Sequence, residues 1–256
     1  MVLESLENHV LTLTIHRPDR KNALTQDMYA QMAEAIATAQ TRQEVRAILL
    51  RGNENFTSGN DLMDFAFFAQ AGTPLRETAT VRFIYTVLNA QKPLLAAVCG
   101  LAVGIGTTVL MHCDAVIVAK DARLSLPFSQ LGLLPEFGSS WLLPEIVGHT
   151  RARHLLMSGE PMSGERAYEI GLATHLCEQD AVYEHALSVC AQYTRLAGNA
   201  IRDTKALIHS EKRKLMLKAV IESELDAFEE ALKSPAFEEA VTAFFEKRKP
   251  DFSRFM

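Results

Sequence analysis

The order in which short apolar runs and longer periodic segments follow one another most strongly limits the folds open to this chain. Three runs, 45–52, 93–100 and 114–120, each contain at least four consecutive apolar residues, as strands buried on both faces of a sheet do. Segment 81–90 lies between the first two runs and segment 26–41 precedes the first, and both repeat apolar residues at helical spacing. Strands that alternate with helices predict an α/β core with a largely parallel sheet.

The remaining segments extend this pattern. Alternating residues predict a half-buried strand over 9–16, and Thr25 is a plausible N-cap for the helix that follows. We expect a loop over 123–141 and one or two helices over 142–159.

From Gly198 the chain becomes almost wholly helical in pattern and dense in charge, after a weak Ala-Gly-Asn breaker. We therefore predict a core of residues 1–197 and a C-terminal helical region of residues 198–256.

Composition excludes several classes of function. A net charge of −5 over 256 residues provides no basic stripe, so we expect no nucleic-acid partner. The four cysteines are widely spaced, without a CxxC pair, which argues against a disulfide framework or a metal site and favours a cytoplasmic protein. The chain shows no signal-peptide pattern, no C-terminal Ser-Lys-Leu and no apolar run long enough for a membrane span.

Two glycine-containing loops, 56–62 and 100–106, each follow a predicted buried strand and lead toward a helix. Glycines at such points let the backbone approach a ligand, and free N–H groups at a helix start attract an oxyanion. Ordinary turn and packing glycines are the alternative explanation. The spacing of Gly100, Gly104 and Gly106 does not match the GxGxxG dinucleotide motif.

Glu136 is the acid whose surroundings suggest chemistry. It lies among apolar and small residues in "LLPEFGSSW", and burial there would raise its pKa toward that of a general base. A solvated loop acid is the other interpretation. Serine catalysis is disfavoured because no serine occupies a GxSxG elbow.

Six ordered segments together resemble the crotonase superfamily, also called the enoyl-CoA hydratase/isomerase family, over nearly the whole chain. They are 16–24, 56–62, 92–114, 126–140, 151–176 and 244–252. The resemblance implies an α/β, crotonase-like spiral of ββα units with a C-terminal helical trimerisation region. It also implies a homotrimer or a hexamer made of two trimers, and an acyl-CoA thioester substrate, of which coenzyme A is part, so no separate cofactor is expected.

The resemblance also assigns residues. In the family two backbone N–H groups polarise the thioester carbonyl, and these match Asn60 and Ile105 here. An adenine pocket would form from Lys21–Leu24 and Gly59–Leu62, and Lys247 matches a tail lysine that meets the 3′-phosphate, often across a subunit boundary. The substrate-binding residues implied are Lys21, Asn22, Ala23, Leu24, Ser58, Gly59, Asp61, Leu62, Gly104, Thr108, Phe128, Pro135 and Lys247.

Departures from the family pattern narrow the reaction. Thr108 and Phe128 stand where hydratases of the family carry their two glutamates, and neither can act as an acid or base near neutral pH. Glu136 matches the position at which Δ3,Δ2-enoyl-CoA isomerases carry their glutamate. The sequence therefore predicts such an isomerase.

Other functions stay open at this point. They are an enoyl-CoA hydratase, a dienoyl-CoA isomerase, an acyl-CoA hydrolase and a non-catalytic acyl-CoA-binding member. Segment 62–77, with Phe65, Phe67 and Phe68, is either a flap over the acyl chain or a packed helix.

Overall fold

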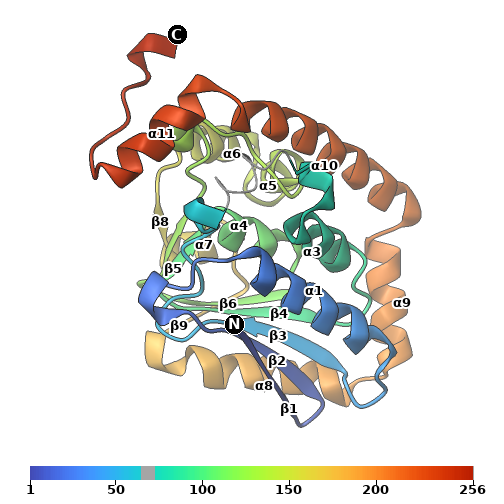
Figure 1. Cartoon of the computed structure of the whole chain (residues 1–256). Coiled ribbons are helices and arrows are strands. Elements are labelled where there is room, and N and C mark those ends of the chain that lie inside the picture. Colours follow the sequence, from blue (N-terminus) through green and yellow to red (C-terminus); the bar gives the residue numbers. More distant parts are fainter. Residues whose placement is uncertain (65–72, 256) are drawn as a thin grey trace.

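A computed structural model describes residues 1–64 and 73–255 of the chain (Figure 1). Among these residues the larger of two sheets has six strands, in the order β1, β2, β3, β4, β6, β9. Their bounds are β1 Val2–Glu7, β2 Val10–Ile15, β3 Ala47–Arg51, β4 Leu94–Val98, β6 Ala115–Ala119 and β9 His175–Cys177. β1 pairs antiparallel with β2 and every other neighbouring pair is parallel, which confirms the predicted, largely parallel sheet.

The central strands are buried because both faces of the sheet are covered. Every residue of β4 and β6 is buried, which explains their continuous apolar runs. Helix α8 (Val182–Arg195) lies on one side of the sheet, and α1 (Gln26–Thr41) and α3 (Ala79–Leu88) lie on the other (Figure 1). The Thr25 side chain accepts the N–H of Met28, so the predicted N-cap of α1 is confirmed.

A second sheet of three short strands was not predicted. It consists of β5 (Leu101–Val103), β7 (Arg123–Ser125) and β8 (Met162–Ser163), in the order β5, β7, β8. The prediction that 123–141 is a loop is wrong at its start, since β7 lies there, and at its end, where α5 begins at Ser139. Strands of two or three residues are too short to show a period of two in the sequence.

The two sheets make the order of elements repeat. A strand of the large sheet, a short strand and a helix occur as β4, β5, α4 and again as β6, β7, α5, with only short 3₁₀ turns inserted, which confirms the expected ββα spiral. Further α-helices that lie wholly within the described residues are α4 Ile105–Thr108, α5 Ser139–Val147, α6 His149–Ser158, α7 Gly164–Glu169, α9 Gly198–Ile208, α10 Glu211–Leu232 and α11 Pro235–Phe245.

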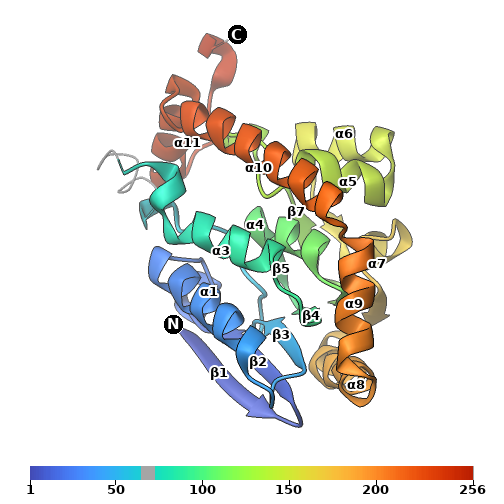
Figure 2. The same ribbon diagram turned by 90° about the vertical axis from the view of Figure 1, so that its right-hand side faces the viewer.

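The C-terminal helices lead the chain away from the sheet. α9 begins at Gly198, where the sequence predicts the helical region to start, and the division into two regions stays a prediction. In both views α10 and α11 lie at the end of the molecule opposite α8 (Figures 1 and 2). None of the helices in the described ranges 1–64 and 73–255 is both long enough and apolar enough to span a membrane.

Candidate active site

The two glycine loops of the sequence lie against each other. The N–H of Thr57 donates to the Leu101 carbonyl at 2.8 Å, and the N–H of Val103 donates back to the Thr57 carbonyl at 3.1 Å. Gly59 has a φ of 92°, and a Cβ atom added to it would lie 2.9 Å from the Val103 carbonyl oxygen. A larger residue would push the loops apart, so this glycine serves close approach of the two backbones.

The two N–H groups that the resemblance assigns to the thioester carbonyl have no partner in the described part of the chain. Among the described residues, no oxygen accepts the N–H of Asn60 or that of Ile105. Ile105 is the first residue of α4, where a helix N–H has no partner within its own helix. Gly104 before it has a φ of 56° and a ψ of −117°, which favours glycine. The Asn60 side chain is fixed separately, since the buried Tyr29 hydroxyl donates to Oδ1 at 2.5 Å.

Both N–H groups belong to residues that line one cavity of about 640 Å³, hereafter the Glu136 cavity. Ten predicted site residues line it: Ala23, Ser58, Gly59, Asn60, Asp61, Leu62, Gly104, Ile105, Phe128 and Glu136. The structure thus brings the predicted acid, both predicted N–H donors and part of the predicted binding segments to one place.

Glu136 is a buried acid in the wall of this cavity, with 7% of its surface exposed. The Thr108 hydroxyl donates to its Oε1 at 2.6 Å. Burial raises the pKa of Glu136 to about 8; the Thr108 hydrogen bond works against this rise and the charge of Glu224 adds to it. The alternative of a solvated loop acid is therefore wrong for this structure.

The backbone beside Glu136 turns through two left-handed residues, Phe137 with a φ of 60° and Gly138 with a φ of 75°. His112 Nε2 lies 2.8 Å from the Phe137 carbonyl oxygen, so this nitrogen carries the proton and donates. Its ring also stacks on the Phe137 ring at a centroid distance of 4.1 Å. Burial lowers the pKa of His112 to about 4, which keeps it neutral and suits a role in holding the turn.

Six of the predicted binding residues lie outside the cavity lining, namely Lys21, Asn22, Leu24, Thr108, Pro135 and Lys247. Thr108 is fully buried, lies outside the cavity lining and contacts the Glu136 carboxylate instead. Pro135 is also outside the lining.

The predicted adenine segments are adjacent. Leu24 donates its N–H to the Gly59 carbonyl at 2.8 Å, and Asp61 donates to the Leu24 carbonyl at 2.9 Å. The Ser58 N–H donates to the Lys21 carbonyl at 3.0 Å. The Asn22 side chain is buried and bonded to the backbone of Arg17 and Asn55, so its contacts are structural.

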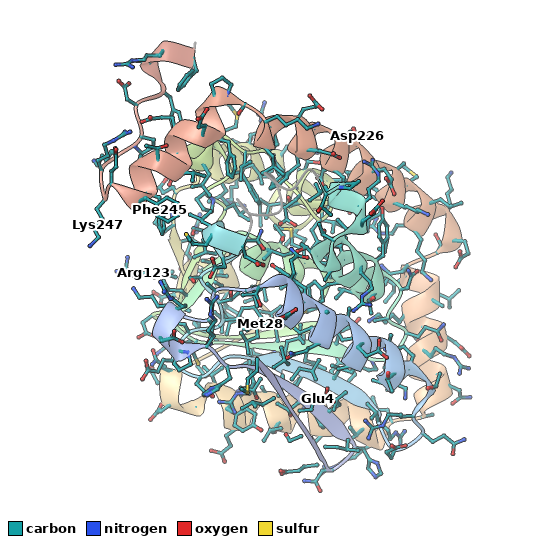
Figure 3. The ribbon with its side chains drawn as sticks, viewed as in Figure 1. Glu4, Met28, Arg123, Asp226, Phe245 and Lys247 are labelled. Atoms are coloured by element: carbon teal, nitrogen blue, oxygen red, sulfur yellow. The ribbon has the colours of Figure 1, made fainter. Side chains whose placement is uncertain are left out.

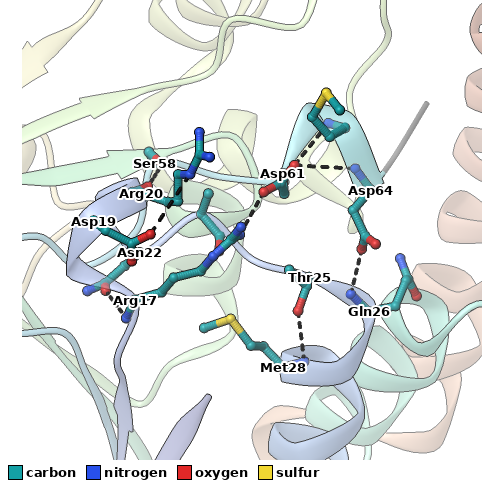
Figure 4. Close-up of polar contacts among 12 residues, drawn as sticks. Arg17, Asp19, Arg20, Asn22, Thr25, Gln26, Met28, Ser58, Asp61 and Asp64 are labelled. Carbon is teal, nitrogen blue, oxygen red and sulfur yellow. Dashed lines mark hydrogen bonds and ion pairs between the residues drawn. The ribbon is translucent and has the colours of Figure 1, made fainter. Parts of the chain in front are cut away.

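Arg17 and Arg20 line the cavity but were not among the predicted site residues, although they lie in segment 16–24, which carries part of the family resemblance. Arg17 forms an ion pair with Asp61 at 2.6 Å (Figure 4). Although burial opposes it, the Arg17 guanidinium and two backbone N–H groups lower the pKa of Asp61.

The C-terminal region supplies further cavity residues, namely Phe228 of α10 and Phe244 and Phe245 of α11. Phe244 and Phe245 lie in segment 244–252, one of the six segments that carry the family resemblance. Lys247 is exposed, outside the cavity lining, and extends from the ribbon just after α11 (Figure 3). Its predicted contact with a phosphate stays a prediction.

Phe65, Phe67 and Phe68 of the proposed flap lie outside the described residues. In the ranges 1–64 and 73–255 no three His, Cys, Asp or Glu side chains cluster as metal ligands would.

Comparison with known proteins identifies the family of this chain. Residues 5–254 match the family described as Enoyl-CoA hydratase/isomerase. The chain is 31% identical to a 1,2-epoxyphenylacetyl-CoA isomerase of Escherichia coli (strain K12), with 98% of each chain covered. It is 32% identical to the peroxisomal enoyl-CoA delta isomerase 3 of Mus musculus, covering 84% of this chain and 69% of the mouse protein.

A crystal structure of an enoyl-CoA hydratase/isomerase from Pseudoalteromonas atlantica T6c superposes with a TM-score of 0.91 at 38% identity, covering 98% of this chain and 99% of that one. The match of nearly the whole chain, in sequence and in fold, shows that this protein belongs to the enoyl-CoA hydratase/isomerase family.

Proposed function

We propose that the protein is a Δ3,Δ2-enoyl-CoA isomerase in which Glu136 is the single acid–base group. One observation carries the proposal. Of the two acids among the described residues that line the cavity, Asp61 is ion-paired with Arg17, whereas the pKa of Glu136 is raised to about 8. Glu136 is thus the acid that can take up and release a proton near neutral pH.

We infer a reaction that uses these groups in turn. Ionised Glu136 takes a proton from C2 of a 3-enoyl thioester, and the electrons move into a dienolate. The N–H groups of Asn60 and Ile105 stabilise its oxygen, by about 3 kcal/mol per donor in comparable sites. Glu136 then returns the proton to C4, so the double bond moves from C3–C4 to C2–C3 and no atom is gained or lost.

Hydration is less well supported. It needs a second group to activate water, and the two family positions for glutamates hold Thr108, which donates to Glu136, and the buried Phe128. Relatives of about 30% identity are named as isomerases and as hydratases, so their names do not decide between the two reactions.

The test is an ultraviolet assay with 3-hexenoyl-CoA, which should yield 2-trans-hexenoyl-CoA. Glu136→Gln should lower kcat by about 10²- to 10⁴-fold, because the amide cannot accept the proton. Glu160→Gln, at an exposed position paired with His154, is the matched control and should leave kcat unchanged. An unchanged rate in Glu136→Gln would overturn the assignment.

Further substrates separate the alternative functions. Hydration of crotonyl-CoA would indicate a hydratase, thiol release a hydrolase, and conversion of a dienoyl-CoA a dienoyl-CoA isomerase. Tight binding of coenzyme A without turnover of any enoyl thioester would indicate a non-catalytic member.

We also propose a trimer or hexamer and a cytoplasmic location. Support for the assembly comes from apolar residues exposed on α9 and α10, of which Leu207 is 81% and Leu215 67% exposed. The location rests on the four unpaired cysteines.

A further inference from the structure

A second buried glutamate lies near the Glu136 cavity without lining it. Glu224 of α10 has 8% of its surface exposed. Its Oε2 accepts the Gly138 N–H at 2.6 Å, and its Oε1 accepts the Ser140 N–H at 2.9 Å. These N–H groups lie at the start of α5, where Gly138 is the N-cap and provides no side-chain hydrogen bond. A residue 84 positions away in the sequence from Ser140 therefore caps this helix.

The capped segment is the one that carries Glu136. Residues 136–140, hereafter the Glu136 turn, are closed by a hydrogen bond from the Ser139 N–H to the Glu136 carbonyl at 3.1 Å. α10 also packs closely on the turn, since a Cβ atom at Gly138 would lie 2.5 Å from Leu217 Cδ1. The Gly138 N–H is two residues from Glu136, so a change in this capping interaction shifts the backbone that presents the carboxylate.

We propose that Glu224 is a positioning residue for the reaction, which holds the Glu136 turn through its two backbone hydrogen bonds so that the Glu136 carboxylate faces the cavity. The inference rests on the proposed function of Glu136. It assigns to the C-terminal helix α10 a part in catalysis besides the cavity wall formed by Phe228.

Glu224 also acts on Glu136 through its charge. The groups near Glu136 come from four elements. They are Tyr29 of α1, Thr108 of α4, His112 of the 3₁₀ helix Val109–His112, and Glu224 of α10. Tyr29 is neutral because burial, Glu136 and Asp64 all raise its pKa, and His112 is neutral because burial lowers its pKa. The negative charge of Glu224 raises the pKa of Glu136. Glu224 therefore influences both the place and the proton affinity of the base.

Two substitutions separate these effects, measured with 3-hexenoyl-CoA as kcat, KM and the pH profile of kcat/KM. Glu224→Gln keeps the side-chain length, removes the charge and leaves one of the two N–H groups facing an amide NH2. We expect kcat to fall by about ten-fold and the rising limb of the profile to move to lower pH. Glu224→Asp keeps the charge and shortens the reach, so kcat should fall while the limb stays in place. KM should change little in both, since Glu224 is outside the cavity lining.

Glu230→Gln is the matched control, because Glu230 is an exposed residue of the same helix paired with Lys233. It should leave kcat and the profile unchanged. Adding Glu224→Gln to Glu136→Gln should cost no further rate, because Glu224 acts through Glu136.

Wild-type kcat and pH profile in both Glu224 variants, with Glu136→Gln inactive, would overturn this inference and leave the proposed function intact. An active Glu136→Gln enzyme would instead overturn the proposed function. If Glu224→Gln does not unfold cooperatively on heating, the kcat and pH profile of Glu224→Asp decide whether the inference stands. Amide hydrogen exchange of the wild-type protein gives a check without variants: Gly138 and Ser140 should exchange as slowly as the core of α10, and fast exchange would overturn the inference.

Discussion

Glu136 and Glu224 are two buried carboxylates in one region of the molecule, and their surroundings give them different roles. Burial raises the pKa of both. Glu136 receives one hydrogen bond, from the Thr108 hydroxyl, and faces a cavity. Glu224 receives two backbone N–H groups, and the Ser140 hydroxyl also favours its ionised form. The hydrogen bonds to Glu224 hold the backbone of the Glu136 turn, whereas Glu136 can still exchange a proton.

The comparison shows that the number of fixed donors decides what a buried carboxylate can do. Several oriented N–H groups replace the hydration that burial removes and stabilise the charged form. A single hydroxyl does so incompletely, and the proton affinity stays high. A base that removes a proton from carbon needs a high proton affinity. A carboxylate that caps a helix needs its charged form to be stabilised.

The largest expected effect is on stability, where the same substitution at the two sites should act with opposite signs. Between pH 4.5, the ordinary value for a glutamate, and about pH 8, folded Glu136 binds more protons than the unfolded chain does. The free energy of unfolding therefore falls as pH rises through this window. Glu136→Ala should raise that free energy at pH 8 by on the order of a few kcal/mol, and should have little effect near pH 4.5.

Glu224→Ala should lower the free energy of unfolding by about 3 kcal/mol, because two buried N–H groups lose their acceptor. We expect this loss to outweigh the gain from removing a carboxylate whose pKa burial also raises. Urea denaturation at pH 8 measures both variants. The comparison fails if Glu136→Ala destabilises the protein at pH 8 as much as Glu224→Ala does.

A smaller effect is expected at Thr108. Thr108→Val removes the hydrogen bond that lowers the pKa of Glu136, so less of the base is ionised at pH 7. We expect kcat/KM for 3-hexenoyl-CoA to fall by about ten-fold at pH 7 and by less at pH 9.5. Thr86→Val, at a half-buried threonine bonded to the Arg82 carbonyl, is the control. An equal loss at every pH would mean that the Thr108 hydroxyl serves the substrate, as the resemblance predicted.

The smallest effect concerns Ser139, which lies between the two residues that Glu224 caps. Its hydroxyl is fully buried and has no hydrogen-bond partner among the described residues. Ser139→Ala should raise the free energy of unfolding by about 1 kcal/mol in urea denaturation, because it removes an unsatisfied polar group. Ser5→Ala, on the exposed strand β1, should leave it unchanged. A clear loss of stability in Ser139→Ala would show that the hydroxyl has a partner.

Of the two buried glutamates, Glu136 could be predicted from the sequence. Glu136 could be identified because its neighbours in the chain are apolar and because the family positions 108 and 128 lack acids. The helical period of α1 and the continuous apolar run of β6 likewise made these elements predictable.

Glu224 could not be identified in this way. In the sequence it is one of several acids on a charge-dense helix, and only the packing of α10 on the Glu136 turn buries it. Phe228 was missed for the same reason, since its place in the cavity depends on how α10 docks. Contacts between distant segments leave no local pattern.

The most direct test of the account is the pH dependence of kcat/KM for 3-hexenoyl-CoA in the wild-type enzyme between pH 5.5 and 9.5. At pH 7 a base with a pKa of about 8 is ionised in roughly one molecule in ten. Since only the ionised form accepts the C2 proton, kcat/KM should rise about ten-fold per pH unit below the pKa and level off above it. A profile that is flat across this range, or already level by pH 6, would contradict the claim that a buried Glu136 is the base.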